Sequence, residues 1–128
     1  MKSIPKLFFA AAAIFALCGM VWGIVMSASG NHMMAPAHGH LNLIGFVAMA
    51  VFGTYYALTP QAAESSLART HYAISVLAVV VMVPGIAMAI SAQQELLAKI
   101  GSLLALVAMA IFALMVFRHG VGPRDQSP

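Results

Sequence analysis

The charged side chains of this chain leave three long intervals in which none occurs, and these intervals limit its fold most strongly. No Asp, Glu, Lys or Arg lies within residues 7–63, 70–94 or 100–117. Only 7% of the residues are charged, against about 25% in soluble domains. A bilayer core about 30 Å thick needs about 20 apolar residues per helical crossing. The sequence therefore predicts an integral membrane protein.

The apolar intervals divide into segments separated by turn-forming residues. We expect membrane crossings at Leu7–Ser27, His38–Leu58, His71–Ile90 and Leu96–Phe117. A backbone in hydrocarbon must form its hydrogen bonds within itself, which favours helices. We predict an all-α fold, a four-transmembrane-helix bundle over residues 1–119, followed by a short polar tail, residues 120–128, which we expect to be disordered. The first segment follows Lys2 and Lys6 as a secretory signal would, but it is long enough to span, so we expect it in the mature protein.

The basic residues predict the orientation. Four crossings put both termini on one side of the membrane. That side holds Lys2, Lys6, Arg69, Arg118 and Arg124, and the other holds only Lys99. The positive-inside rule then predicts cytoplasmic termini, in a bacterial inner membrane, with the histidine-bearing link facing the periplasm. The net charge of +3 reflects this topology and gives no indication of nucleic acid as a partner.

Glycines recur at a spacing that suits helix packing. The first segment carries Gly19 and Gly23, the second Gly45 and Gly53, and the fourth Gly101. Such stripes let helix backbones approach closely, within one chain or between copies. A glycine face also leaves room for a flat macrocycle, so the stripes alone do not choose between these uses.

Two histidines, His38 and His40, stand where the second apolar segment begins. On a helix, residues two apart point about 200° away from each other. They therefore cannot clasp one metal ion, but each can serve a ligand on its own face. Asn42, Gly45 and Met49 follow on the His38 side. This geometry suits flat cofactors on either side of one helix, with those residues beside the cofactor that His38 holds.

Two other interpretations of these histidines stay open. In a non-helical turn they would bind copper together with His32, Met33 and Met34, because imidazole and thioether ligands suit copper. Alternatively both are neutral residues at headgroup level, hydrogen-bonded to carbonyls or water. A pair on one turn, with a third histidine nearby, favours ligation over this last interpretation.

Two stretches resemble consecutive helices of the haem–copper oxidase catalytic subunit, closest to the cbb-type oxidases and nitric oxide reductases. They are AHGHLNLIGFVAMAVFGTYYALTP and ARTHYAISVLAVVVMVPGIAMAI. The shared elements, in order, are His38-Gly39-His40, Gly45-Phe46, Phe52-Gly53, Tyr55-Tyr56, Leu58-Thr59-Pro60 and His71-Tyr72. The resemblance implies that His38 ligates a high-spin haem and His40 a low-spin haem. His71 begins its helix far from that site, so we expect it to cap or anchor the helix end.

The chain also departs from that family. The family subunit has about a dozen helices, and its copper ligands and second low-spin haem ligand lie on helices that have no counterpart here. Complete oxidase activity by this chain alone is therefore not expected. We predict a membrane protein that binds haem b, for electron transfer, haem handling or gas sensing beside a respiratory-chain partner. We expect a homo-oligomer in the lipid bilayer, since four helices leave a porphyrin facing lipid. The alternatives are a copper-binding protein and a non-catalytic accessory subunit.

Overall fold

The computed structural model describes residues 3–125 and consists of long helices that run up and down. In chain order they are α1 (Ile4–Ser29), α2 (Ala35–His40), the π-helix η1 (Leu41–Val47), α3 (Ala48–Leu58), the short α4 (Pro60–Ala63), α5 (Ser66–Ala92) and α6 (Leu96–His119). The segments α2, η1 and α3 follow one another without a break. This gives four helices long and apolar enough to cross a membrane: Ile4–Ser29, Ala35–Leu58, Ser66–Ala92 and Leu96–His119. The predicted all-α four-helix fold is confirmed.

The crossings extend beyond the predicted limits at most of their ends. Helix α1 begins where the Ser3 hydroxyl accepts a hydrogen bond from the Lys6 backbone N–H at 3.2 Å, a typical helix N-cap. It ends at Gly30, whose φ of 69° is the left-handed conformation that glycine tolerates. Lys6 and Arg69 thus lie inside helices, because long basic side chains can keep their charge at the membrane surface while the backbone stays helical.

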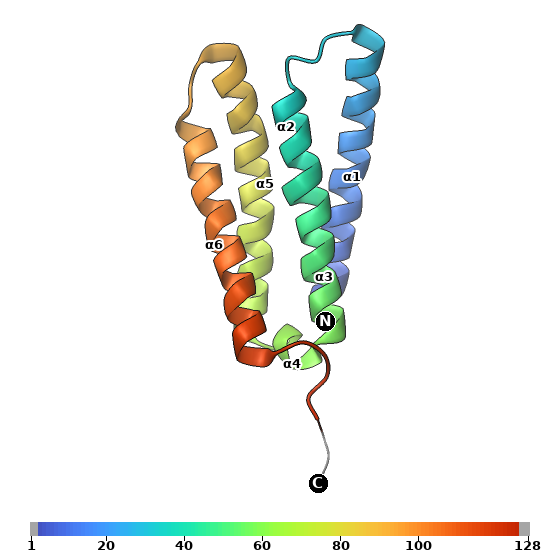
Figure 1. The fold of residues 1–128 in the computed structure, drawn as a ribbon, viewed down its shortest axis with the longest axis vertical. Coiled ribbons are helices and arrows are strands. Elements are labelled where there is room, and N and C mark those ends of the chain that lie inside the picture. The colour runs from blue at the N-terminus through green and yellow to red at the C-terminus, as the bar shows by residue number, and fades with distance from the viewer. Residues whose placement is uncertain (1–2, 126–128) are drawn as a thin grey trace.

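Both termini lie at one end of the bundle, as four crossings require (Figure 1). We call this the terminal end; it also carries α4. The opposite end, with the α1–α2 link and the α5–α6 turn, is called the link end. Of the lysines and arginines among the described residues, the terminal end holds Lys6, Arg69, Arg118 and Arg124, whereas the link end holds only Lys99. The charge asymmetry on which the orientation was predicted is therefore present in the fold, although the orientation itself stays a prediction.

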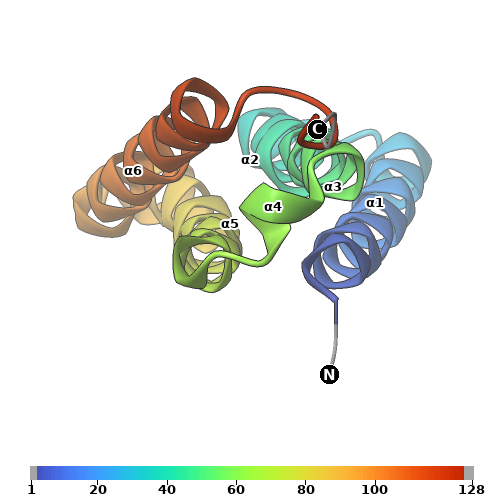
Figure 2. The same ribbon diagram turned by 90° about the horizontal axis from the view of Figure 1, so that it is seen from below.

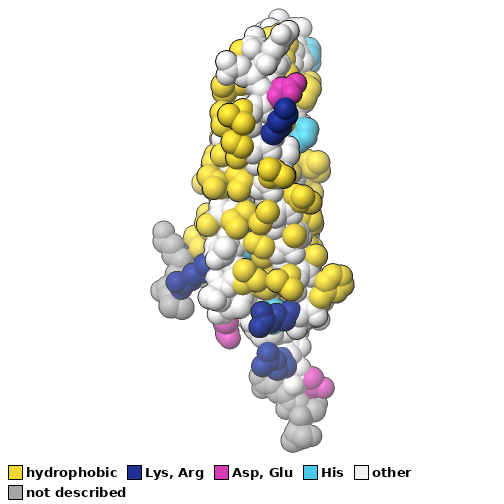
Figure 3. Space-filling view, turned by 90° about the vertical axis from the view of Figure 1, so that its left-hand side faces the viewer, with side chains coloured by type: hydrophobic (Ala, Val, Ile, Leu, Met, Phe, Trp, Pro, Cys, Tyr) yellow, Lys and Arg dark blue, Asp and Glu magenta, His cyan; other side chains and the backbone are white. Residues whose placement is uncertain are grey.

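The helices are arranged as two hairpins (Figure 2). Helices α5 and α6 make the most extensive contact of any two helices, and α1 packs along η1 and α3. Helices α3 and α5 lie towards the middle, whereas α1 and α6 lie outside. Many large apolar side chains remain exposed, including Ile24 at 69% and Leu103 at 64%. Figure 3 shows such side chains over the length of one face, with charged groups towards its ends. This surface suits contact with lipid.

Glycines let the helices approach within the chain. A Cβ atom on Gly101 would lie 2.5 Å from Cα of Met82, and one on Gly85 would lie 2.5 Å from the backbone N of Ala98. Helices α5 and α6 are thus in backbone contact at two levels. Gly45 is covered by the side chain of Phe15. The glycines of the predicted stripes therefore serve packing inside one copy.

The start of the polar tail is ordered against the bundle, contrary to expectation. The Gly122 N–H donates to the Thr59 hydroxyl at 3.0 Å, and the Gln61 side-chain amide donates to the Gly122 carbonyl at 2.9 Å. The Tyr55 hydroxyl lies 2.8 Å from the Gly120 carbonyl. These bonds hold the end of α6 to α3 and α4. The last three tail residues, 126–128, lie outside the described part of the chain.

Candidate functional site

His38 lies on the inner side of α2 and is half-buried against α1. Its Nε2 atom is 2.9 Å from the backbone oxygen of Gly19. A carbonyl only accepts, so Nε2 carries the proton and Nδ1 holds the lone pair. The ring also meets Trp22 edge to face, with centroids 6.0 Å apart, and lies over Gly23. Gly19 and Gly23 of α1 therefore leave the space that the His38 ring occupies.

The other residues predicted on the His38 side also face α1 or the core. The Asn42 amide nitrogen lies 3.3 Å from His38 Nε2, and its oxygen fills the space beside Gly19. Because Nε2 already donates to Gly19, this approach is a contact and not a second bond. Gly45 is buried under Phe15, and Met49 is 0% exposed. His38 could meet haem iron through Nε2 only after releasing Gly19, and protein atoms fill the face below it.

His40 lies on the other side of the helix and is exposed. Its Nδ1 atom is 2.7 Å from the backbone oxygen of Pro36, one turn earlier. The same reasoning puts the proton on Nδ1, so Nε2 holds a lone pair and points away from that bond. Histidines that ligate metals are commonly oriented by such a bond to a carbonyl. The structure thus separates the two rings as predicted, with His38 held in the bundle and His40 free to bind outside it.

The residues of the copper interpretation lie in or beside the α1–α2 link. His32 and Met33 are exposed, Met34 is half-buried, and the His32 Nδ1 atom is 3.3 Å from the Gly30 carbonyl. Within residues 3–125, no three His, Cys, Asp or Glu side chains converge to hold a metal ion. The helical setting of His38 and His40 is also not the turn that this interpretation assumed. Copper binding by these residues stays a prediction.

A buried polar cluster near the terminal end was not predicted. His71 is 0% exposed, so the expectation that it anchors a helix end was wrong. Its Nδ1 atom is 2.8 Å from the Tyr56 hydroxyl, and its ring lies 4.5 Å from the ring of Phe52. Helix α5 begins at Ser66, more than a turn before His71. His71 therefore lies inside the helix and not at its end, and its imidazole is in the core.

This cluster contains two polar atoms without a hydrogen-bond partner among the described residues. They are His71 Nε2 and the hydroxyl of Ser75, one turn further along α5. Ser75 also lines a small cavity of about 40 Å³ between α3, α5 and α6. A cavity needs about 10–15 Å³ to hold a water molecule, so water fits but a porphyrin does not. The part of α1 that packs on His71, at Phe8, lies eleven residues from Gly19, or about 16 Å along the helix. The cluster is therefore separate from His38.

Comparison of the chain with protein-family models, curated proteins and solved structures found no match. The resemblance to the haem–copper oxidases accordingly stays a prediction from the quoted residues.

Proposed function

We propose that this protein is a multi-pass membrane protein that binds b-type haem through His40 and takes part in electron transfer. The observation that carries the proposal is the bond between His40 Nδ1 and the Pro36 carbonyl at 2.7 Å. It orients the ring and leaves the Nε2 lone pair of an exposed imidazole unengaged, which is what a ligand to iron needs. The likeness of the second crossing to an oxidase helix supports His40 as a haem ligand, although the likeness extends to His38 as well.

The surface below His40 suits the flat apolar face of a porphyrin. Positions three, four and seven residues after a helical residue lie near its face. Leu43 and Val47 are the third and seventh, whereas the fourth, Ile44, packs inward against α5. Leu43 is 59% exposed and Val47 is 46% exposed. The intervening π-helix alters this register somewhat but leaves both side chains outside the core.

His40 would supply one ligand to the iron, and the apolar surface of the macrocycle would need cover from other groups. Within residues 3–125 no second histidine lies on the outer face of this helix beside His40. We therefore propose a homo-oligomer in which another copy packs against this face and covers the porphyrin. When bound, haem b supplies a one-electron centre whose potential depends on its axial ligands. The basic terminal end supports placing the termini in the cytoplasm, and His40 towards the periplasm, of a bacterial inner membrane.

The test is the visible spectrum of the full chain, expressed with ample haem supply and purified in a mild detergent. We expect a Soret band that shifts on reduction, and we expect His40→Ala to abolish most of it. His32→Ala is the matched control, since it removes an exposed histidine from the same end of the molecule. His38→Ala should keep the band if the haem uses His40. A wild-type protein without a Soret band, or a His40→Ala variant that retains it fully, would overturn the proposal.

A further inference from the structure

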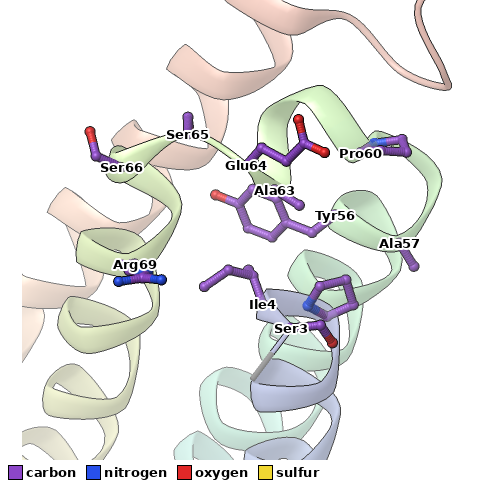
Figure 4. A pocket seen from close by; sticks show the side chains of 11 residues that line it. Ser3, Ile4, Tyr56, Ala57, Pro60, Ala63, Glu64, Ser65, Ser66 and Arg69 are labelled. Atoms are coloured by element: carbon purple, nitrogen blue, oxygen red, sulfur yellow. The ribbon is translucent and has the colours of Figure 1, made fainter. Parts of the chain in front are cut away.

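A pocket of about 660 Å³ opens at the terminal end, away from both histidines of the second crossing (Figure 4). Its lining comes from the start of α1, the end of α3, α4 and the start of α5. Three of the crossings end or begin here, so a bilayer around the bundle would place the pocket near the depth of the lipid headgroups. Its volume is in the range of ordinary ligand pockets, about 300–1,000 Å³. The proposed function does not use it.

Among the described residues that line the pocket, one carries each sign of charge, and the two do not form an ion pair with each other. Glu64 follows α4 and Arg69 lies in the second turn of α5. Figure 4 shows them on different sides of the Tyr56 ring. Within residues 3–125, no ion pair is formed by either side chain, whereas Lys99 and Glu95 at the link end approach to 3.5 Å. Both charges of the pocket are therefore available to a ligand.

The uncharged lining divides into hydroxyl and apolar groups. The Ser3 hydroxyl accepts from the Lys6 backbone, so its own proton can be donated. Ser66 is exposed at the rim, whereas the Tyr56 hydroxyl is engaged with His71 and offers its ring alone. Ile4, Ala57 and Pro60 supply apolar wall. A ligand that matches this lining carries a phosphate, a cation close to it, and an apolar portion.

We propose that the pocket binds the headgroup of a phospholipid with a primary ammonium, that is, a phosphoethanolamine lipid. Arg69 binds the phosphate, for which the guanidinium fork is well suited, and the serine hydroxyls add donors. Glu64 accepts hydrogen bonds from the ammonium. The headgroup of phosphatidylglycerol would place an uncharged glycerol beside Glu64, which can donate O–H hydrogen bonds but has no positive charge to pair with the carboxylate. A trimethylated ammonium has no N–H to donate to that carboxylate.

The experiment measures retained lipid by native mass spectrometry of the full chain in detergent. Three lipids with identical acyl chains are compared: phosphatidylethanolamine, phosphatidylcholine and phosphatidylglycerol. We expect phosphatidylethanolamine to be retained about fivefold better than either competitor, because an exposed ion pair contributes modestly. Glu64→Gln should remove this preference, and Arg69→Gln should weaken binding of all three lipids. Glu95→Gln, which neutralises a carboxylate at the link end, is the matched control and should change nothing.

The possible results are distinct. Equal retention of the three lipids, better retention of phosphatidylglycerol, or an unchanged preference in Glu64→Gln would each overturn the proposal. Free phosphoethanolamine added in excess should displace the lipid only weakly, because it lacks the apolar portion. Full displacement would show that the site takes the soluble headgroup and would refute the lipid assignment. None of these measurements uses haem absorbance, so their outcome is independent of the role of His40.

Discussion

The closest approach between helices makes Gly101→Ala the sharpest test of the packing. A Cβ atom at this position would lie 2.5 Å from Cα and 2.6 Å from Cβ of Met82, whereas ordinary contacts begin at 3.4 Å. The shortfall is 3.4 − 2.5, or about 0.9 Å, and it is against backbone, which cannot rotate away. Helices α5 and α6 would have to separate by about that distance. Overpacking of this kind costs about 1–3 kcal/mol.

Gly39→Ala is the control for this substitution. Gly39 also lies in a helix, but nothing stands within 4 Å of the position where its Cβ would be. Alanine is the better helix former by up to about 1 kcal/mol at either site. This gain is common to both variants, so their difference in unfolding free energy isolates the steric cost.

The assay is reversible unfolding of the full chain in mixed micelles with increasing SDS, followed by tryptophan fluorescence and circular dichroism. We expect Gly101→Ala to be less stable than Gly39→Ala by about 1–3 kcal/mol. Equal stability of the two variants would refute the reasoning, because the α5–α6 contact could then not be as close as described.

Two further predictions concern the polar groups of the core. Gly19→Ala should displace the Asn42 side chain and lower the unfolding free energy by about 1 kcal/mol. This is the low end for overpacking, because a side chain can move aside. The Soret band should persist in this variant, and its loss would show that haem binding depends on the His38 side. Ser75→Ala removes a buried hydroxyl that has no partner among the described residues, so stability should stay within about 0.5 kcal/mol of wild type or rise. A loss of more than about 1 kcal/mol in the same SDS titration would show instead that the hydroxyl is satisfied, with water in the adjoining cavity as its partner.

The sequence was sufficient to predict the membrane crossings. The lack of charge over long intervals is a strong signal, and it does not depend on how the helices pack against one another. The limits of the crossings were less accurate. The prediction stopped at charged residues such as Lys6 and Arg69, yet the backbone stays helical through both. A helix end depends on capping geometry, here the bond from the Lys6 N–H to the Ser3 hydroxyl, and not on where apolar residues cease.

The local part of the site was also predictable, whereas its long-range part was not. That His38 and His40 point apart follows from their spacing alone. The contact of His71 with Tyr56 depends on how the α3–α5 connection folds, and the residues beside it give no local signal for it. Glu64 and Arg69 line one pocket because of how the same α3–α5 connection folds. The π-helical form of residues 41–47 could not be anticipated from these apolar residues, which occur equally well in α-helices.

The wide turns of η1 join two parts of one membrane rod that have different surroundings. A π-helical segment holds an extra residue relative to an α-helix of equal span. Rewinding it into α-helix would therefore twist everything before it by about 100° around the rod axis. His38 and His40 stand before this joint, and the anchored aromatic residues of α3 stand after it. The joint thus sets the azimuth of both imidazoles. Deleting one residue within it would let the segment become α-helical with both imidazoles near their present azimuth, whereas rewinding all seven residues would rotate the two together.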